Sequence, residues 1–183
     1  MSACPQCGVD LPEEDGPIHR YFGASPACWA AYGQVLEREY ADPAFFKNHR
    51  MTVDAYALQH PGDRSPQAVQ SVNIHLISTT FIFKYKAKSD RALKAMQTIS
   101  AASKKDKNLF FWLKPPASLG QITVLDVLPL TRLEDHLKAV EDWARSAWQA
   151  WESHHSIAES HLRRFGFISV SYTHLTLPTI LRV

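Results

Sequence analysis

The sequence lacks the charge imbalance and the long apolar runs that mark several large classes of protein. Its 20 Lys and Arg residues are matched by 18 Asp and Glu residues, which leaves a net charge of +2. A nucleic-acid surface needs a clustered excess of positive charge, so we expect no nucleic-acid partner. No apolar run reaches the ~18 residues of a membrane-spanning helix, so we expect no membrane association. A protein partner or a small-molecule ligand stays open.

Glycine and cysteine are also scarce. Seven glycines in 183 residues favour a helical fold over a β fold with many turns. Two of the three cysteines are separated by two residues, a spacing that favours metal binding or redox chemistry over disulfides. No apolar signal segment follows Met1, so we expect a cytoplasmic protein. The sequence has no phosphate loop, dinucleotide fingerprint or nucleophile elbow, which leaves most enzyme classes without support.

Proline predicts where the long helices begin. Three successive segments open with Ser-Pro or Asp-Pro, in which the first residue caps a helix and proline occupies its first turn. Apolar residues at helical spacing continue each segment. The long helices expected before residue 104 are 26–40, 43–60, 66–87 and 90–103.

After residue 104 the sequence predicts shorter elements and one last long helix. Residues 109–113 form an apolar run that is either a strand or an extended segment, and Thr123 can cap a short helix over 123–128. Thr131, with Glu134 as its capping-box partner, begins a last long helix that ends near Arg164. We therefore predict an all-α protein, a single-domain helical bundle over residues 1–169 with a coil-rich segment at 1–24.

The last fourteen residues, 170–183, do not continue this pattern. Their first ten, VSYTHLTLPT, resemble the in-frame translation of a transposon-end sequencing adapter. We therefore expect an artefactual tail and leave His174 out of the ligand candidates. The alternative is a genuine strand, because Val170, Tyr172 and Leu175 have strand propensity.

The strongest chemical motif is CPQCG at residues 4–8, which has the spacing of a zinc knuckle. Thiolates at Cys4 and Cys7 can bind one tetrahedral ion, and Gly8 lets the backbone turn around it. Cys28 lies in the first turn of the 26–40 helix, where free amides and the helix dipole favour a thiolate. A redox role, or no role, is the alternative for these cysteines.

Three thiolates need a fourth ligand. His19 lies between the second and third cysteines and is the first choice, with His49 or His60 as alternatives. We expect a structural zinc ion that pins the segment 1–24 onto the bundle. The protein would then act as a binding or adaptor module.

The other histidines suggest a second metal site. His49 and His60 lie on one face of the same predicted helix but stand about 16 Å apart along its axis, so they cannot share an ion. Histidines on separate helices can meet inside a bundle. The candidate cluster is His75 and His155 with His49 or His60.

Such a cluster would make the protein a metal-dependent hydrolase or transferase, with Asp54 or Tyr56 as the acid–base group. The alternative is that these are ordinary hydrogen-bonded histidines of the core. His136 and His161 lie near charged residues, so they look exposed and receive no role.

Several segments together resemble an uncharacterised, mostly bacterial family known only as a domain of unknown function. They are CPQCG (4–8), GASPACW (23–29), TVDAYALQHPG (52–62) and WARSAWQAWESHH (143–155). The resemblance implies that the cysteines and the Trp-His helix belong to a family pattern, and it implies no activity. Placing histidines on separate helices is also similar, more weakly, to DinB-type four-helix metalloproteins.

Overall fold

Helices account for most of the structure, a computed structural model that describes residues 1–169. The expected tail at 170–183 lies outside the described residues. The α-helices are α1 (Pro26–Ala41), α2 (His49–Gln59), α3 (Pro66–Tyr85), α4 (Ser89–Lys105), α5 (Val124–Val127), α6 (Leu133–Ala150) and α7 (His155–Arg164). Two short 3-10 helices are η1 (Phe45–Asn48) and η2 (Glu152–His154), and β1 (Ser2–Ala3) pairs antiparallel with β2 (Asp10–Leu11). The all-α prediction is therefore confirmed.

Serine caps begin two helices as predicted. The Ser25 hydroxyl accepts a hydrogen bond from the Cys28 backbone N–H at 3.3 Å, and the Ser65 hydroxyl accepts one from the Ala68 N–H at 3.2 Å. The expected helix 43–60 differs, because Asp42 caps Ala44 at 2.8 Å and the chain first forms η1 before α2 begins at His49. The 3-10 helix η1 therefore forms part of the connection between α1 and α2.

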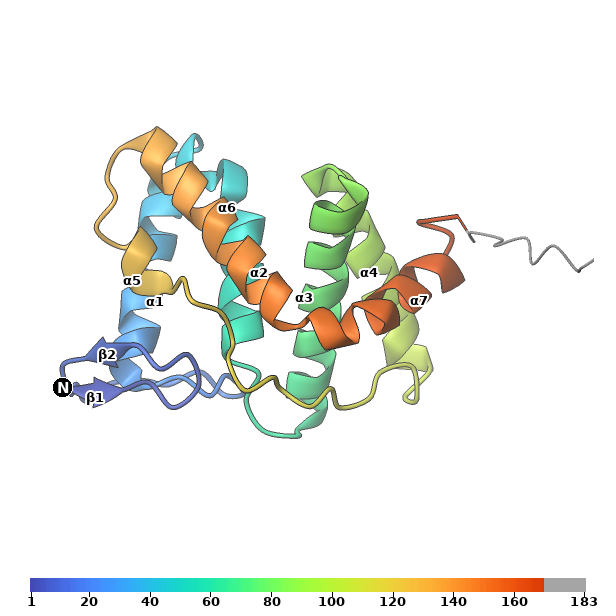
Figure 1. Cartoon of the computed structure of the whole chain (residues 1–183), viewed down its shortest axis with the longest axis horizontal. Coiled ribbons are helices and arrows are strands. Elements are labelled where there is room, and N and C mark those ends of the chain that lie inside the picture. The colour runs from blue at the N-terminus through green and yellow to red at the C-terminus, as the bar shows by residue number, and fades with distance from the viewer. Residues whose placement is uncertain (170–183) are drawn as a thin grey trace, which may run out of the picture.

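The predicted last helix is divided. It ends at Ala150, passes through η2 and resumes as α7, and its N-cap is Arg132 without a side-chain cap, so the predicted Thr131 cap is wrong. A capping box forms instead at the predicted short helix, between Thr123 and Asp126. The break lets α6 pack on α2 while α7 packs on α3 (Figure 1). One straight helix could not pack against both α2 and α3 in this way.

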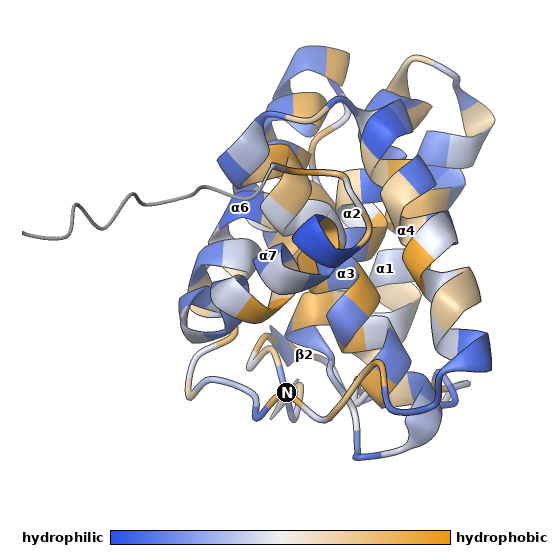
Figure 2. Cartoon of the chain, turned by 90° about the vertical axis from the view of Figure 1, so that its right-hand side faces the viewer, coloured by the Kyte–Doolittle hydropathy of each residue, from blue (hydrophilic) through white to orange (hydrophobic). Residues whose placement is uncertain are grey.

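The apolar residues form two clusters. The α3–α4 core joins α3, α4, α7 and the 109–119 segment, and its largest members include Phe81, Leu113 and Trp151. Figure 2 looks onto these helices, along which apolar and polar stretches alternate. The cysteine core joins the N-terminal segment, α1, α5 and parts of α2 and α6, and it includes Cys28, Tyr56 and Trp143.

Helix α2 lies between the two clusters and positions the functional residues. It packs against α6 and α3, and every residue from Asp54 to Gln59 is buried. The buried Trp143 donates its indole N–H to Gln59 at 2.7 Å, and Trp151 donates to the Leu58 carbonyl at 3.0 Å, which fixes the C-terminal end of α2. Among residues 1–169, no helix is long and apolar enough to cross a membrane.

Candidate metal centre

The CPQCG turn folds as a knuckle closed by its own backbone. The Cys4 N–H donates to the Val9 carbonyl at 2.8 Å, and the Gly8 N–H donates to the Cys4 carbonyl at 2.9 Å. Gly8 has φ +75°, a left-handed conformation that glycine adopts without strain. Residues on either side of the turn continue into β1 and β2. The turn thus presents Cys4 and Cys7 toward α1.

Helix α2 supplies a histidine immediately after its last turn. The His60 ring packs against Tyr56, with ring centroids 4.0 Å apart. Its Nδ1 lies 2.8 Å from the Tyr56 carbonyl oxygen, which can only accept a hydrogen bond. Nδ1 therefore carries the proton, and Nε2 is left with a lone pair. A backbone carbonyl that fixes the tautomer in this way is a common second contact of metal-binding histidines.

Gly62 holds the knuckle against the end of α2. Its N–H donates to Gln6 Oε1 at 3.0 Å, and Gln6 Nε2 donates to the Gly62 carbonyl at 3.4 Å. Gly62 has φ +68°, and a Cβ atom there would lie 1.9 Å from the Tyr21 carbonyl oxygen. Only glycine fits, so the Pro61-Gly62 stop both ends α2 and docks the N-terminal segment.

Four donor atoms converge between these segments. The sulfurs of Cys4, Cys7 and Cys28 and one nitrogen of His60 all lie within 4.8 Å of one another. The Sγ atoms of Cys7 and Cys28 are 3.8 Å apart, and His60 Nε2 lies 3.6 Å from Cys4 Sγ and 3.4 Å from Cys28 Sγ. The thiols are free, since a disulfide would bring its sulfurs to about 2.05 Å.

The three shortest of these distances are close to the edges of a zinc tetrahedron. With Zn–S bonds of about 2.3 Å and a Zn–N bond of about 2.0 Å, the edges measure roughly 3.8 Å between sulfurs and roughly 3.5 Å between sulfur and nitrogen. Cys4 and Cys28 are buried, His60 is buried, and Cys7 is partly exposed. The cluster is therefore compatible with one tetrahedrally coordinated ion.

The contacts among the three thiols shift their pKa values in opposite directions. A hydrogen bond from Cys28 is the main cause that lowers the pKa of Cys4, and the same contact raises the pKa of Cys28. The contact with Cys28 lowers the pKa of Cys7, but Cys4 and burial outweigh it and raise that pKa to about 11. Three adjacent thiolates repel one another, so a cation is the natural means of holding all three.

A family model matches most of the chain. The model is described as "Family of unknown function (DUF5946)", and it matches residues 2–152. The chain belongs to this family. The matched residues contain all three cysteines and His60, and they end before α7. No curated protein and no solved structure matches the chain.

His19, the first choice for the fourth ligand, is not among the four converging residues. Its ring is held by aromatic neighbours instead: it stacks on Phe22 at 4.3 Å and meets Tyr21 edge-on at 4.4 Å. Burial lowers the pKa of His19, and its Nδ1 is buried without a hydrogen bond in residues 1–169. The geometry favours His60 as the fourth ligand, because the end of α2 and not the 8–24 loop faces the sulfurs.

The four histidines of the second candidate site have separate partners. His60 joins the cysteines, His49 bonds to Glu39 at 2.7 Å, and His155 stacks on Trp148 at 4.4 Å. Within residues 1–169, only the Cys3His group brings three or more Cys, His, Asp or Glu side chains close enough to share an ion. A shared inter-helix site is therefore not formed by these histidines.

His75 instead joins a buried ion pair. Its Nδ1 lies 2.7 Å from Asp54 Oδ1, and Arg50 and Ser78 donate to the same carboxylate at 2.6 Å each. Burial raises the pKa of Asp54, but Arg50 and His75 outweigh it and hold the pKa below its usual value. Tyr56, the other acid–base candidate, donates to Cys28 Sγ at 3.7 Å and so lies beside the cysteine–histidine cluster.

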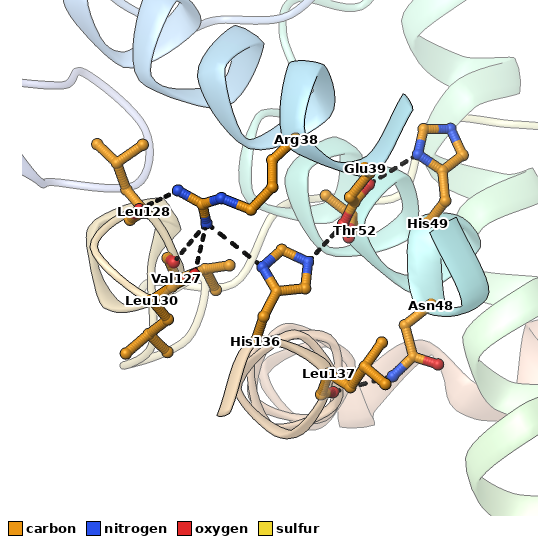
Figure 3. A network of polar contacts seen from close by, with 10 residues as sticks. All are labelled: Arg38, Glu39, Asn48, His49, Thr52, Val127, Leu128, Leu130, His136 and Leu137. Carbon is orange, nitrogen blue, oxygen red and sulfur yellow. Dashed lines mark hydrogen bonds and ion pairs between the residues drawn. The ribbon is translucent and has the colours of Figure 1, made fainter. Parts of the chain in front are cut away.

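The sequence reasoning missed a second polar cluster, because His136 looked exposed. His136 is fully buried, and its Nε2 lies 3.2 Å from the equally buried Glu39 carboxylate (Figure 3). His161 is buried too, against Phe110. The signal was helical spacing: Glu39 continues the buried stripe of Cys28, Tyr32 and Val35 on α1.

Proposed function

We propose that Cys4, Cys7, Cys28 and His60 bind a structural zinc ion, and that the protein acts as a binding or adaptor module. The observation that carries the proposal is the convergence of the four donor atoms, which all lie within 4.8 Å of one another. Three sulfurs and one imidazole nitrogen form a soft donor set, which suits zinc, whereas magnesium and calcium prefer oxygen.

A structural role fits better than a catalytic one. Catalytic zinc sites keep one coordination position for water or substrate, whereas structural sites are filled by four protein ligands. Here two ligands come from the knuckle, one from α1 and one from the end of α2. The ion would therefore cross-link three segments that are distant in sequence.

The segment 1–24 would depend on that cross-link. Residues 12–18 are all exposed, so this stretch buries little apolar surface of its own. Because a preformed site rarely exists in an unfolded chain, metal-binding free energy becomes folding free energy. Free thiols suit a reducing compartment, so we also propose a cytoplasmic location.

A binding role is supported by a hollow that the pinned segment creates. A cavity of about 320 Å³ lies between the 18–24 stretch and the turn after α2, and its lining includes Pro5, Ile18, Tyr21 and Gly62. That volume is at the lower end of ligand pockets. Its size suits a small molecule or a few side chains of a protein partner.

Metal analysis of the purified protein tests the proposal. We expect one zinc per chain by elemental mass spectrometry, with loss of the metal in Cys28→Ser and in His60→Ala. His19→Ala is the matched control and should keep its zinc. Absence of zinc from the unmodified chain, prepared with zinc in the medium, would overturn the proposal. Zinc kept by His60→Ala but lost by His19→Ala would restore His19 as the ligand.

A further inference from the structure

A chain of three polar side chains runs from the surface to the interior where α1 meets α2. The Tyr40 hydroxyl lies 3.3 Å from His49 Nε2, and His49 Nδ1 lies 2.7 Å from Glu39 Oε2. Tyr40 and Glu39 are near the end of α1, and His49 is the first residue of α2. None of the three belongs to the sulfur site.

The surroundings decide which atom carries each proton. Burial raises the pKa of Glu39, but hydrogen bonds from His136, His49 and Thr52 outweigh it and hold that pKa below its usual value. Glu39 is therefore a carboxylate, which accepts a hydrogen bond from His49 Nδ1–H. In the neutral form of His49, Nε2 then has a lone pair that can accept a hydrogen bond from the Tyr40 hydroxyl.

The exposed fraction of these three side chains falls from Tyr40 to His49 to Glu39. Tyr40 is 67% exposed, the His49 side chain is 15% exposed and Glu39 is fully buried. An exposed hydroxyl, a histidine base and a buried carboxylate that orients the base form the arrangement of nucleophilic catalysis. The His75–Asp54 pair does not share this arrangement, because Ser78 donates to Asp54 itself at 2.6 Å and not to His75.

The buried carboxylate is held rigidly. Thr52 donates to Glu39 Oε1 at 2.5 Å, and His136 Nε2 lies 3.2 Å from the same oxygen. Arg38 lies 3.5 Å from His136 Nδ1 and donates to the carbonyls of Leu128 and Leu130 at 2.7 and 2.8 Å. Figure 3 shows His49 and His136 on the two sides of Glu39. Preorganisation of this kind fixes a base before a substrate arrives.

We propose that Tyr40 is a nucleophile activated by His49, and that it accepts acyl groups from aromatic esters. The neighbouring surface is aromatic: Phe46 stacks on His49 with centroids 4.5 Å apart, lies 5.5 Å from the Tyr40 ring and is 44% exposed. An aryl group can pack on this ring while its ester carbonyl approaches the tyrosine oxygen.

The proposed reaction is ester hydrolysis through an acyl-tyrosine intermediate, and it needs no cofactor. The Tyr40 proton moves to His49 Nε2 while an oxygen lone pair attacks the ester carbonyl carbon. The tetrahedral intermediate breaks its bond to the alcohol or phenol oxygen, which leaves with the proton from His49. Water then attacks the acyl carbon while His49 Nε2 takes its proton; the bond from that carbon to the Tyr40 oxygen breaks, the carboxylic acid leaves, and His49 returns the proton to the Tyr40 oxygen. Glu39 positions His49 and touches no substrate.

The test uses p-nitrophenyl acetate with the full chain. We expect nitrophenolate release and an acetyl group on the Tyr40 peptide by mass spectrometry. Tyr40→Phe should abolish that modification, and His49→Ala should lower its rate by about 100-fold, as loss of a general base does. Tyr85→Phe is the matched control, because Tyr85 donates directly to the Glu159 carboxylate at 2.8 Å and has no histidine in the contact.

Two further measurements separate catalysis from packing. Added imidazole should restore acetylation of Tyr40 in His49→Ala, which a misfolded variant would not allow. Glu39→Asp should keep more activity than Glu39→Gln because a carboxylate is required, whereas a packing role would favour the isosteric glutamine. The inference fails if Tyr40 is acetylated no faster than free N-acetyltyrosinamide, or if His49→Ala keeps the full rate.

Discussion

The two ends of α2 each place a histidine beside buried groups that can carry negative charge, but the partners of those groups differ. At its C-terminal end α2 brings His60 to three thiols, and at its N-terminal end it brings His49 to the Glu39 carboxylate. The carboxylate end is complete, because Glu39 receives hydrogen bonds from Thr52, His49 and His136. At the sulfur end the side chains contact one another: Cys7 Sγ lies 3.8 Å from Cys28 Sγ, and His60 Nε2 lies within 3.6 Å of the Sγ atoms of Cys4 and Cys28. The carboxylate is thus matched by protein donors, whereas the three sulfurs and the imidazole nitrogen form a donor set that is compatible with a metal ion.

Metal removal should have the largest effect and should act on one end only. Because the ion would cross-link the knuckle, α1 and α2, we expect a chelator to lower the free energy of unfolding by on the order of 5 kcal/mol or more. Urea denaturation measures the change, and limited proteolysis should show new cleavage in residues 12–18. If the chelator changes neither the free energy of unfolding nor the proteolysis pattern, the cysteine–histidine cluster is stable without a metal ion.

The second prediction removes a carboxylate from a cluster that needs no ion. Asp54→Ala leaves Arg50 and His75 without their shared partner in the interior. Breaking a buried pair in this way costs about 3–5 kcal/mol. Urea denaturation should show that loss with the zinc content unchanged. A loss below about 1 kcal/mol would mean that water reaches the pair and replaces the carboxylate.

The third prediction concerns how the N-terminal segment docks. Gly62→Ala forces a side chain into the left-handed region and against the Tyr21 carbonyl, so we expect about 1–3 kcal/mol of destabilisation and weaker zinc binding. Gly33 is the matched control: it lies within α1, and a Cβ atom there would meet nothing within 4 Å. Gly33→Ala should stabilise the protein by up to about 1 kcal/mol. Equal effects at both glycines would contradict the docking role of Gly62.

The smallest effect should come from acid titration of the carboxylate end. The folded-state pKa of Glu39 is lowered, so its contribution to stability is present above the ordinary carboxyl pKa of about 4.3 and is lost as pH falls through the folded-state value. The effect is small because burial opposes the hydrogen bonds. The stability of Glu39→Gln should therefore vary less with pH between 7 and 3 than that of the unmodified chain. Parallel curves for the two proteins would show that Glu39 does not titrate differently on folding.

Sequence patterns predicted the local elements well. The Ser25 and Ser65 caps and the Thr123 helix formed as expected, since each depends on hydrogen bonds between residues at most four positions apart. The break at Trp151 was not predicted, because it follows from packing α6 on α2 and α7 on α3. His136 was expected to be exposed beside its charged neighbours, and Glu39 received no role, although both lie on the buried stripe of a helix.

The sequence by itself determined an all-α fold, family membership and the presence of a zinc-knuckle spacing with a third cysteine in the first turn of a helix. Only the tertiary structure decided which histidine faces the sulfurs. His19 is close in sequence, but aromatic packing holds it elsewhere, and His60 arrives from 32 residues beyond Cys28. The physical reason is that a tetrahedral site selects donors by their distance in space, which depends on how α2 packs, and not by their spacing along the chain.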